Sequence, residues 1–171
     1  MRFWGITGLG ETEALHQVVA AGGLHSVQVV YNLLNPSTGR QMPAGFPYQD
    51  YRQLTDRAAD RGIGVIAIRI LAGGALSGTP DRHPVAAHSV NPISTEPEYA
   101  ADVARARRFS FLVEEGIVKN PIEGAIRFAL SKPEISTALV GISSLEQREY
   151  AVACANRGPL PAEALSRLQK V

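Results

Sequence analysis

A junction with residue types that could bind an anion runs from Val140 to Gln147, with the sequence VGISSLEQ. Gly141 lets the backbone approach a ligand closely, and the free N–H groups at the start of a helix attract a phosphate. A structural interpretation stands beside this one, because Ser144 followed three residues later by Gln147 is also the pattern of a helix capping box. The stretch by itself supports both interpretations.

Three further polar side chains stand in or just after predicted strands. Gln28 lies within an apolar strand, Tyr31 ends the same strand, and Arg69 follows another. Each has a structural alternative to ligand binding. Gln28 could be the polar position of an alternating strand, Arg69 an ion-pair partner within the fold, and Tyr31 a rim aromatic with its hydroxyl in water.

Several kinds of chemistry have no residues to support them. The predicted strand ends carry no paired carboxylates, and His, Cys, Asp and Glu do not recur at metal-ligand spacing, so no metal site is expected. The glycines of residues 5–10 do not match the dinucleotide fingerprint of a Rossmann fold. Cys154 lies in an apolar helical stretch, which indicates a small core residue. The histidines are left outside any site: His16, His25, His83 and His88.

Strands alternate with helices along the chain. The predicted strands cover residues 2–6, 26–31, 64–68 and 137–140. The predicted helices cover residues 11–21, 50–61, 100–115, 121–130, 145–155 and 161–170, with irregular segments over 35–47 and 72–97. This alternation predicts an α/β fold with a parallel sheet and right-handed crossovers. Ligands of such sheets bind at the carboxyl ends of the strands, which is where the polar residues above stand.

Composition limits the partners. The 171 residues fit one domain, and a formal net charge of +1 without a basic stripe makes nucleic acid an unexpected partner. Arg105, Arg107 and Arg108 read as a solvated helix face. No apolar run is long enough to cross a bilayer, and the first residues lack the features of a signal peptide, so a cytoplasmic location is expected.

The chain resembles the aldo-keto reductases in several stretches taken in order. Residues 62–67 with 71–78 are similar to the seventh-strand region of that family, and residues 27–34 to the sixth. Residues 125–130 and 137–147 are similar to the closing helix, strand and cofactor-phosphate loop. The resemblance covers nearly the whole chain and implies half of a TIM-type (β/α)8 barrel, equivalent to strands 5–8, followed by C-terminal helices.

The resemblance also implies an activity. Aldo-keto reductases transfer a hydride between a nicotinamide cofactor and a carbonyl or alcohol, with a tyrosine acid supported by aspartate, lysine and histidine. Those residues sit on the early strands of the family, which this chain does not contain. No catalytic residue is therefore assigned, and Tyr31 matches a sixth-strand position without that role.

The half of the family's barrel that this chain resembles implies a cofactor site. The residues at the family's cofactor positions are Thr7, Gly8, Gln28, Arg69, Leu71, Gly73, Gly141, Ile142, Ser143 and Gln147. Thr7, Gly8 and Gln28 match positions near the nicotinamide carboxamide, whereas Arg69 replaces a serine near the pyrophosphate. Leu71 and the glycines after it match the loop that wraps the cofactor. The 141–147 residues match the loop around the adenosine phosphate, so the resemblance favours the anion-binding interpretation of that junction.

Some positions depart from the family pattern. Ile68 stands where many members carry an aromatic ring that stacks on the nicotinamide, and Tyr150 and Ala151 replace a Glu-Asn pair near the adenine. The 141–147 loop has no Lys or Arg. NADP(H) is expected because the family mostly uses it, with NAD(H) as the other possibility.

Three functions are compatible with these residues. The first is an oxidoreductase half that acts on a small carbonyl compound only when another chain completes it. The second is a non-catalytic binder of dinucleotides or phosphates, and the third is a half-barrel enzyme of another kind, such as a phosphosugar isomerase. The open edges of a half barrel also predict self-association.

Overall fold

One parallel sheet forms the centre of the computed structural model, which describes residues 1–171. Its four strands lie in the order β1 (Gly5–Thr7), β2 (Ser26–Val30), β3 (Gly64–Ile68) and β4 (Thr137–Ala138). All three neighbouring pairs are parallel. Parallel pairing requires a crossover after each strand, and helices supply it here. The predicted class of parallel βα units is confirmed.

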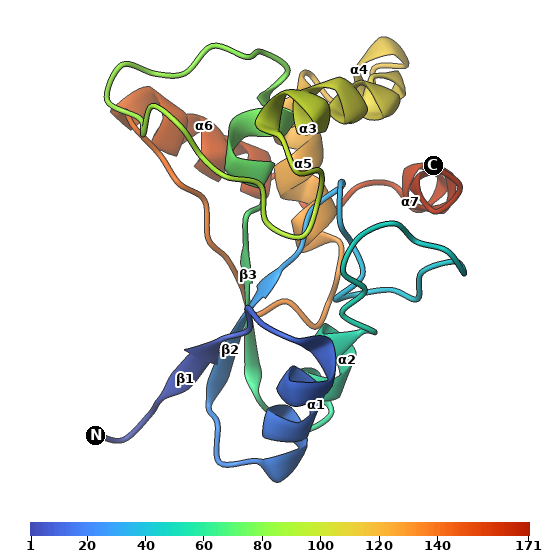
Figure 1. Ribbon diagram of the computed structural model, residues 1–171. Coiled ribbons are helices and arrows are strands. Elements are labelled where there is room, and N and C mark those ends of the chain that lie inside the picture. The colour runs from blue at the N-terminus through green and yellow to red at the C-terminus, as the bar shows by residue number, and fades with distance from the viewer.

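The helices lie mainly in two groups, with the last helix apart from both near the C-terminus (Figure 1). They are α1 (Thr12–Ala21), α2 (Leu54–Ala59), the 3-10 turn η1 (Ala72–Ser77), α3 (Tyr99–Ala106), the 3-10 turn η2 (Arg107–Phe109), α4 (Phe111–Glu114), α5 (Pro121–Leu130), α6 (Leu145–Ala155) and α7 (Ala162–Leu168). Figure 1 shows α1 and α2 together at one end of the molecule and α3 to α6 at the other. None of these helices has the length and apolarity needed to cross a lipid bilayer.

The two faces of the sheet have different environments. Val27 and Val29 of β2 and Val65 of β3 are fully buried, because alternate side chains of these strands pack against the helices. Gln28 of β2 and Ile66 of β3 alternate with these buried residues, so they point to the opposite face and stay partly exposed. One face of the sheet is therefore the core, and the other is open.

Strand register aligns residues across the open face. Thr7 pairs with Gln28, Gln28 with Ile66, and Ile66 with Thr137. Paired residues of parallel strands point to the same face, so these four side chains form one row. The outer strands β1 and β4 each pair on one side alone. Figure 1 shows β1 at an open edge with no element beyond it.

Several element boundaries differ from the sequence-based prediction. The helix predicted over 50–61 begins only at Leu54, because Arg52 and Gln53 have positive φ angles of 47° and 59° that no helix continues through. The outer strands are shorter than predicted, at three residues for β1 and two for β4, since each has one pairing partner. The irregular segment predicted over 72–97 contains the turn η1.

Residues 31–39 after β2 are buried, so the first part of the polar loop predicted over 35–47 lies inside the fold, whereas residues 41–47 are mostly exposed as a polar loop would be. The Asn32 carboxamide oxygen accepts from the N–H groups of Leu34 and Asn35, both at 2.9 Å. Asn35 Nδ2 donates to the carbonyl oxygens of Gln49 and Ser94 at 3.0 and 2.6 Å. These bonds satisfy polar groups that burial would otherwise penalise. The loop is therefore a fixed part of the carboxyl end of the sheet.

Two side chains test predictions about the core. Tyr31 is 5% exposed and stacks on Phe128 of α5 with ring centroids 5.0 Å apart, so its ring lies in the core and is not a rim aromatic. Burial raises the pKa of the Tyr31 phenol above its ordinary value. Cys154 is buried, at 1% exposure, which confirms its prediction as a core residue.

Candidate functional site

A cleft of about 1040 Å³ lies at the carboxyl ends of the strands. Its walls come from the segments that follow β3 and β4, from helices α5 and α6, and from the irregular segment 78–98. Fifteen of its 27 lining residues are hydrophobic, and the charged ones are few. A mainly apolar cleft with a few polar groups is the usual form of a small-molecule site.

Most of the sequence-predicted site residues line this cleft. They are Gln28, Arg69, Leu71, Gly73, Gly141, Ile142, Ser143 and Gln147. Thr7 and Gly8 lie outside the lining but beside it. Thr7 is in register with Gln28, and the Gly8 N–H donates to the Gln28 carbonyl oxygen at 2.7 Å. The structure thus gathers residues far apart in sequence, while their contact with a ligand stays a prediction.

Arg69 contributes a cation without a protein partner. Its backbone adopts a positive φ of 59°, and its carbonyl oxygen accepts from Asn32 Nδ2 at 2.9 Å. Its guanidinium makes no hydrogen bond, and no carboxylate lies within ion-pair distance of it. The interpretation of Arg69 as an ion-pair partner is therefore wrong. A free guanidinium in a cleft is suited to binding a phosphate.

The turn after β3 needs a glycine at position 73. Gly73 has a φ of 68°, and a Cβ there would lie 2.6 Å from Val90 Cγ1 and 3.3 Å from Arg69 Nη1. Arg82 fixes the same turn, since its Nη1 donates to the Gly73 carbonyl oxygen at 2.8 Å and its Nε to that of Ala87 at 2.7 Å. A bare backbone beside a free cation fits the pyrophosphate of a dinucleotide.

The junction from Val140 to Gln147 forms a helix cap. Ser144 Oγ accepts from the Gln147 N–H at 3.3 Å, and Gln147 Oε1 accepts from the Ser143 N–H at 2.7 Å. Helix α6 begins at the next residue, Leu145. The capping interpretation is confirmed. Anion binding at the same junction stays a prediction.

Two titratable groups of α6 line the cleft. The pKa of Glu146 lies below its usual range, because its own backbone N–H and the Ser144 hydroxyl stabilise the carboxylate. Burial raises the pKa of Tyr150, and the neighbouring Cys154 thiol raises it further. At neutral pH this wall therefore carries one negative charge and one un-ionised phenol.

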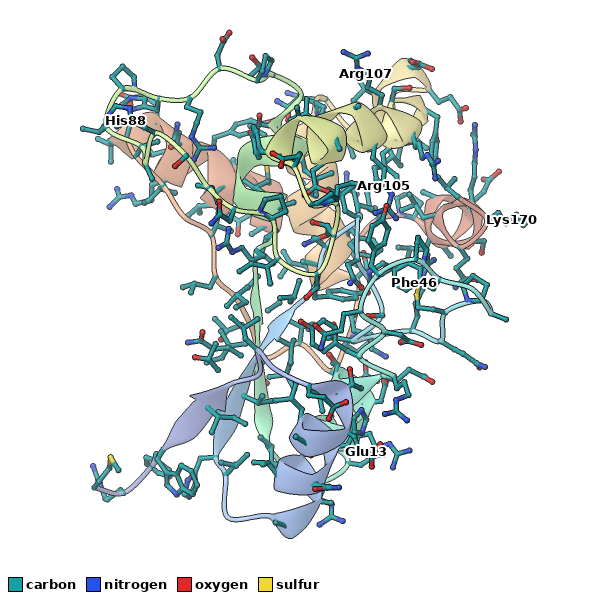
Figure 2. The ribbon with its side chains drawn as sticks, in the orientation of Figure 1. Glu13, Phe46, His88, Arg105, Arg107 and Lys170 are labelled. Atoms are coloured by element: carbon teal, nitrogen blue, oxygen red, sulfur yellow. The ribbon has the colours of Figure 1, made fainter.

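Sequence reasoning missed one wall of the cleft. Arg82, His83 and Val90 of the 78–98 segment line it, together with Tyr99 of α3. The sequence marks this segment only as irregular, and nothing in it indicates the path taken past the turn after β3. The sequence places no histidine in a site, yet His83 lines this cleft. His88 is exposed, and Figure 2 shows it on the outer part of this segment.

No group of three or more His, Cys, Asp and Glu side chains is arranged to hold a metal ion. The cleft combines a free guanidinium, a glycine turn, the carboxylates of Asp81 and Glu146, amides and apolar walls. This set can bind a molecule that combines flat rings with phosphates.

Comparisons with known proteins agree with the parallel βα architecture described above. The aldo/keto reductase family model matches residues 2–171. Apo and holo structures of aldo-keto reductase AKR11C1 from Bacillus halodurans are similar, each with 18% identity and a TM-score of 0.65. The similarity covers 99% of this chain but 50% and 49% of those chains, so this chain spans about half their length. The sheet corresponds to part of a TIM-type barrel. No curated protein sequence matches the chain significantly.

Proposed function

The chain belongs to the aldo/keto reductase family, and from this premise we propose that it is the dinucleotide-binding half of an NAD(P)(H)-dependent oxidoreductase. One observation carries the proposal. Residues following β3 and β4, and Gln28 of β2, line a single cleft at the carboxyl edge of the sheet. A nicotinamide dinucleotide supplies hydride chemistry when bound.

The residues of the cleft have separate tasks in this proposal. Arg69 pairs with the pyrophosphate, because its guanidinium has no partner in the protein. The turn at Gly73 lets the backbone approach the same group. Gln28 supplies an amide to the carboxamide from the open face of the sheet, where Thr7 stands beside it. The 141–147 loop lies against the adenosine end.

Reduction of a carbonyl also needs a proton. No lysine lines the cleft, and of its two tyrosines Tyr150 has a raised pKa, which makes it a weaker acid. We therefore assign the proton donor to a complementing chain that supplies further βα units against the open face. Reduction of a small carbonyl substrate therefore requires the complementing chain. A cytoplasmic location remains part of the proposal.

Binding and turnover test this function separately. Titration of NADH or NADPH fluorescence with the chain should give a dissociation constant no tighter than roughly micromolar to millimolar, about 4 to 8 kcal/mol, because part of the enclosing wall is open. Oxidation of the same cofactor by a small aldehyde should be undetectable with the chain alone. Absence of binding at millimolar cofactor, or turnover by the isolated chain, would contradict the proposal.

A second function follows if no complementing chain exists. The absence of a lysine from the cleft favours a dinucleotide binder without hydride transfer. The two functions differ in one measurement. Addition of a protein that carries the complementary βα units should produce carbonyl reduction by an oxidoreductase half. It should leave a pure binder inactive, although the complex forms.

A further inference from the structure

The direction of the Arg69 side chain depends on the Arg69 backbone. Its guanidinium makes no ion pair, and its Nη1 lies beside the turn at Gly73, 3.3 Å from where a Cβ of that residue would stand. Since no partner holds the far end of the side chain, the backbone angles decide where it points. The Arg69 φ of 59° is left-handed, which is strained for a residue with a Cβ and persists only where the surrounding structure enforces it.

The Asn32 side chain holds this strained backbone. The pairing of β2 with β3 reaches the Tyr31 N–H, which donates to the Ile68 carbonyl oxygen at 3.3 Å. One residue further the bond comes from a side chain, because Asn32 Nδ2 donates to the Arg69 carbonyl oxygen at 2.9 Å. The Ala72 N–H donates to the same oxygen at 2.7 Å. The carbonyl is therefore held by two donors.

Asn32 is itself fixed by its surroundings. It is 1% exposed, and its Oδ1 accepts from the N–H groups of Leu34 and Asn35, both at 2.9 Å. These bonds determine which end of the carboxamide faces Arg69, because the opposite orientation would place two carbonyl oxygens together. The amide is thus a rigid, buried donor directed at residue 69.

We infer that Asn32 is a positioning residue of the dinucleotide site, because its bond to the Arg69 carbonyl keeps the Arg69 guanidinium directed into the cleft. The inference rests on the proposed function, in which Arg69 pairs with the pyrophosphate. Asn32 does not line the cleft and acts through Arg69. A guanidinium that is already in place loses less conformational freedom on binding, which strengthens the complex.

A double-mutant cycle tests whether Asn32 acts through Arg69. Asn32→Ser keeps a hydroxyl that can accept from the N–H groups of the turn, but this hydroxyl is too short to reach the Arg69 carbonyl. In fluorescence titrations with NADH, the substitution should weaken binding by at least about fivefold, since a charge-assisted contact is no longer preorganised. In the Arg69→Ala background it should change the affinity by less than about twofold, because no guanidinium remains to be positioned.

Thr38→Val is the matched control for the loss of a buried hydrogen bond. Thr38 is fully buried in the same loop, and its Oγ1 donates to the Val30 carbonyl oxygen at 2.7 Å, away from the cleft lining. Both Thr38→Val and Asn32→Ser should lower the midpoint of urea unfolding. Only Asn32→Ser should weaken NADH binding.

The Arg69 guanidinium also offers a spectroscopic signal. Its Nε–H resonance in a proton–nitrogen correlation NMR spectrum can be identified by its absence from Arg69→Ala. Inorganic pyrophosphate should shift this resonance in wild type and in Thr38→Val. At the same pyrophosphate concentration the shift should be about half as large or smaller in Asn32→Ser, because fewer molecules bind the phosphate.

A second variant tests the inference if Asn32→Ser does not fold. Glycine adopts a left-handed backbone without strain, so Arg69→Gly needs no support at its carbonyl. Asn32→Ser should therefore fold in the Arg69→Gly background and lower the urea midpoint less there than in wild type. Failure to fold in both backgrounds would overturn the inference, since Asn32 would then be needed for its own turn.

The outcomes separate this inference from the proposed function. Wild-type NADH affinity in Asn32→Ser, or an equal loss of affinity with and without the Arg69 side chain, would overturn the inference and leave the proposed function standing. An Arg69 resonance that pyrophosphate shifts equally in wild type and Asn32→Ser would do the same. Absence of NADH binding by wild type would overturn both.

Discussion

At the residue scale, two arginines of the cleft differ in what they contact. Arg82 makes hydrogen bonds to two carbonyl oxygens and lies over the Tyr99 ring, with its Cζ 5.6 Å from the ring centroid. Arg69 makes none of these contacts and faces the cleft freely. The first arginine holds the wall in shape, and the second remains available to a ligand.

Replacing Arg69 should therefore weaken binding without unfolding the protein. Arg69→Ala should reduce dinucleotide affinity by about 1.5 to 3 kcal/mol, the usual contribution of a charge-assisted hydrogen bond. Fluorescence titration measures the change. His88→Ala is the control, because His88 is exposed and outside the cleft, and it should bind as wild type does. Equal affinity of all three proteins would refute the role of Arg69.

Ile68 allows the opposite experiment, a gain of affinity. It lines the cleft at the end of β3, where it offers a nicotinamide only aliphatic contact. Ile68→Tyr should strengthen dinucleotide binding by about 0.5 to 1.5 kcal/mol through ring stacking. Ile66→Tyr provides a matched control, since Ile66 is on the same strand and face but outside the cleft lining. A gain of equal size in both variants would show that stacking at position 68 is not the cause.

At the element scale, Glu123 joins α5 to the end of α6. This carboxylate is 1% exposed and accepts from Arg127 Nη1 at 2.9 Å, Arg157 Nη1 at 3.3 Å and the Lys119 N–H at 3.1 Å. Burial opposes its ionisation, but the backbone N–H and the two guanidinium groups outweigh burial and lower its pKa. Since α5 and α6 form one wall of the cleft, Glu123 also supports the site.

The lowered pKa of Glu123 predicts acid sensitivity. Its contribution to folding is present above the unfolded-state pKa of about 4.3 and is lost as pH falls through the lower folded-state pKa. Glu123→Gln should lower the free energy of unfolding at pH 7 by about 2 kcal/mol, because it removes bonds to charged donors. Urea unfolding at several pH values measures this.

The difference in the free energy of unfolding between wild type and Glu123→Gln should narrow below about pH 4, where the wild-type carboxylate also becomes neutral. Glu163→Gln is a suitable control, as Glu163 is exposed on α7 and makes no ion pair. A difference that stays constant down to the acid transition would mean that the Glu123 charge does not contribute to folding.

At the scale of the whole molecule, exposed apolar side chains gather at the two open ends of the sheet. Met1, Phe3, Trp4, Leu9 and Val18 are exposed on or beside β1 and α1. Leu139, Ile142, Leu145 and Val152 are exposed after β4 and on α6. Both outer strands also have unpaired backbone groups along their free edges. These edges and the open face are suited to contact with another protein chain.

The isolated chain should therefore self-associate. Light scattering over a range of concentrations should show a rising mass, and a hydrophobic dye should bind. Phe3→Lys should reduce the association, because Phe3 is 70% exposed at the β1 edge. Val171→Lys, at an exposed valine away from both edges, should leave it unchanged. A monomer at every concentration, with no dye binding, would rule this prediction out.

The sequence alone determined the features that depend on local interactions. The strands of residues 26–30 and 64–68 follow from short runs of β-branched residues, and the predicted helices over 121–130 and 145–155 match α5 and α6. Pro121 and Ser144 mark the starts of those helices through signals that involve only a few neighbouring residues. The alternation of these strands and helices along the chain also predicted the parallel sheet.

The enclosure of the cleft depends on contacts that the sequence does not reveal. The 78–98 segment forms a wall through bonds to residues outside it, among them those from Arg82 to the Gly73 carbonyl and from Asn35 to the Ser94 carbonyl. Residue types in an irregular segment do not encode such partners. Burial of Tyr31 depends likewise on Phe128, almost a hundred residues later in the chain. The local sequence determined the two central strands and the cap, and long-range packing determined which side chains meet at the carboxyl edge of the sheet.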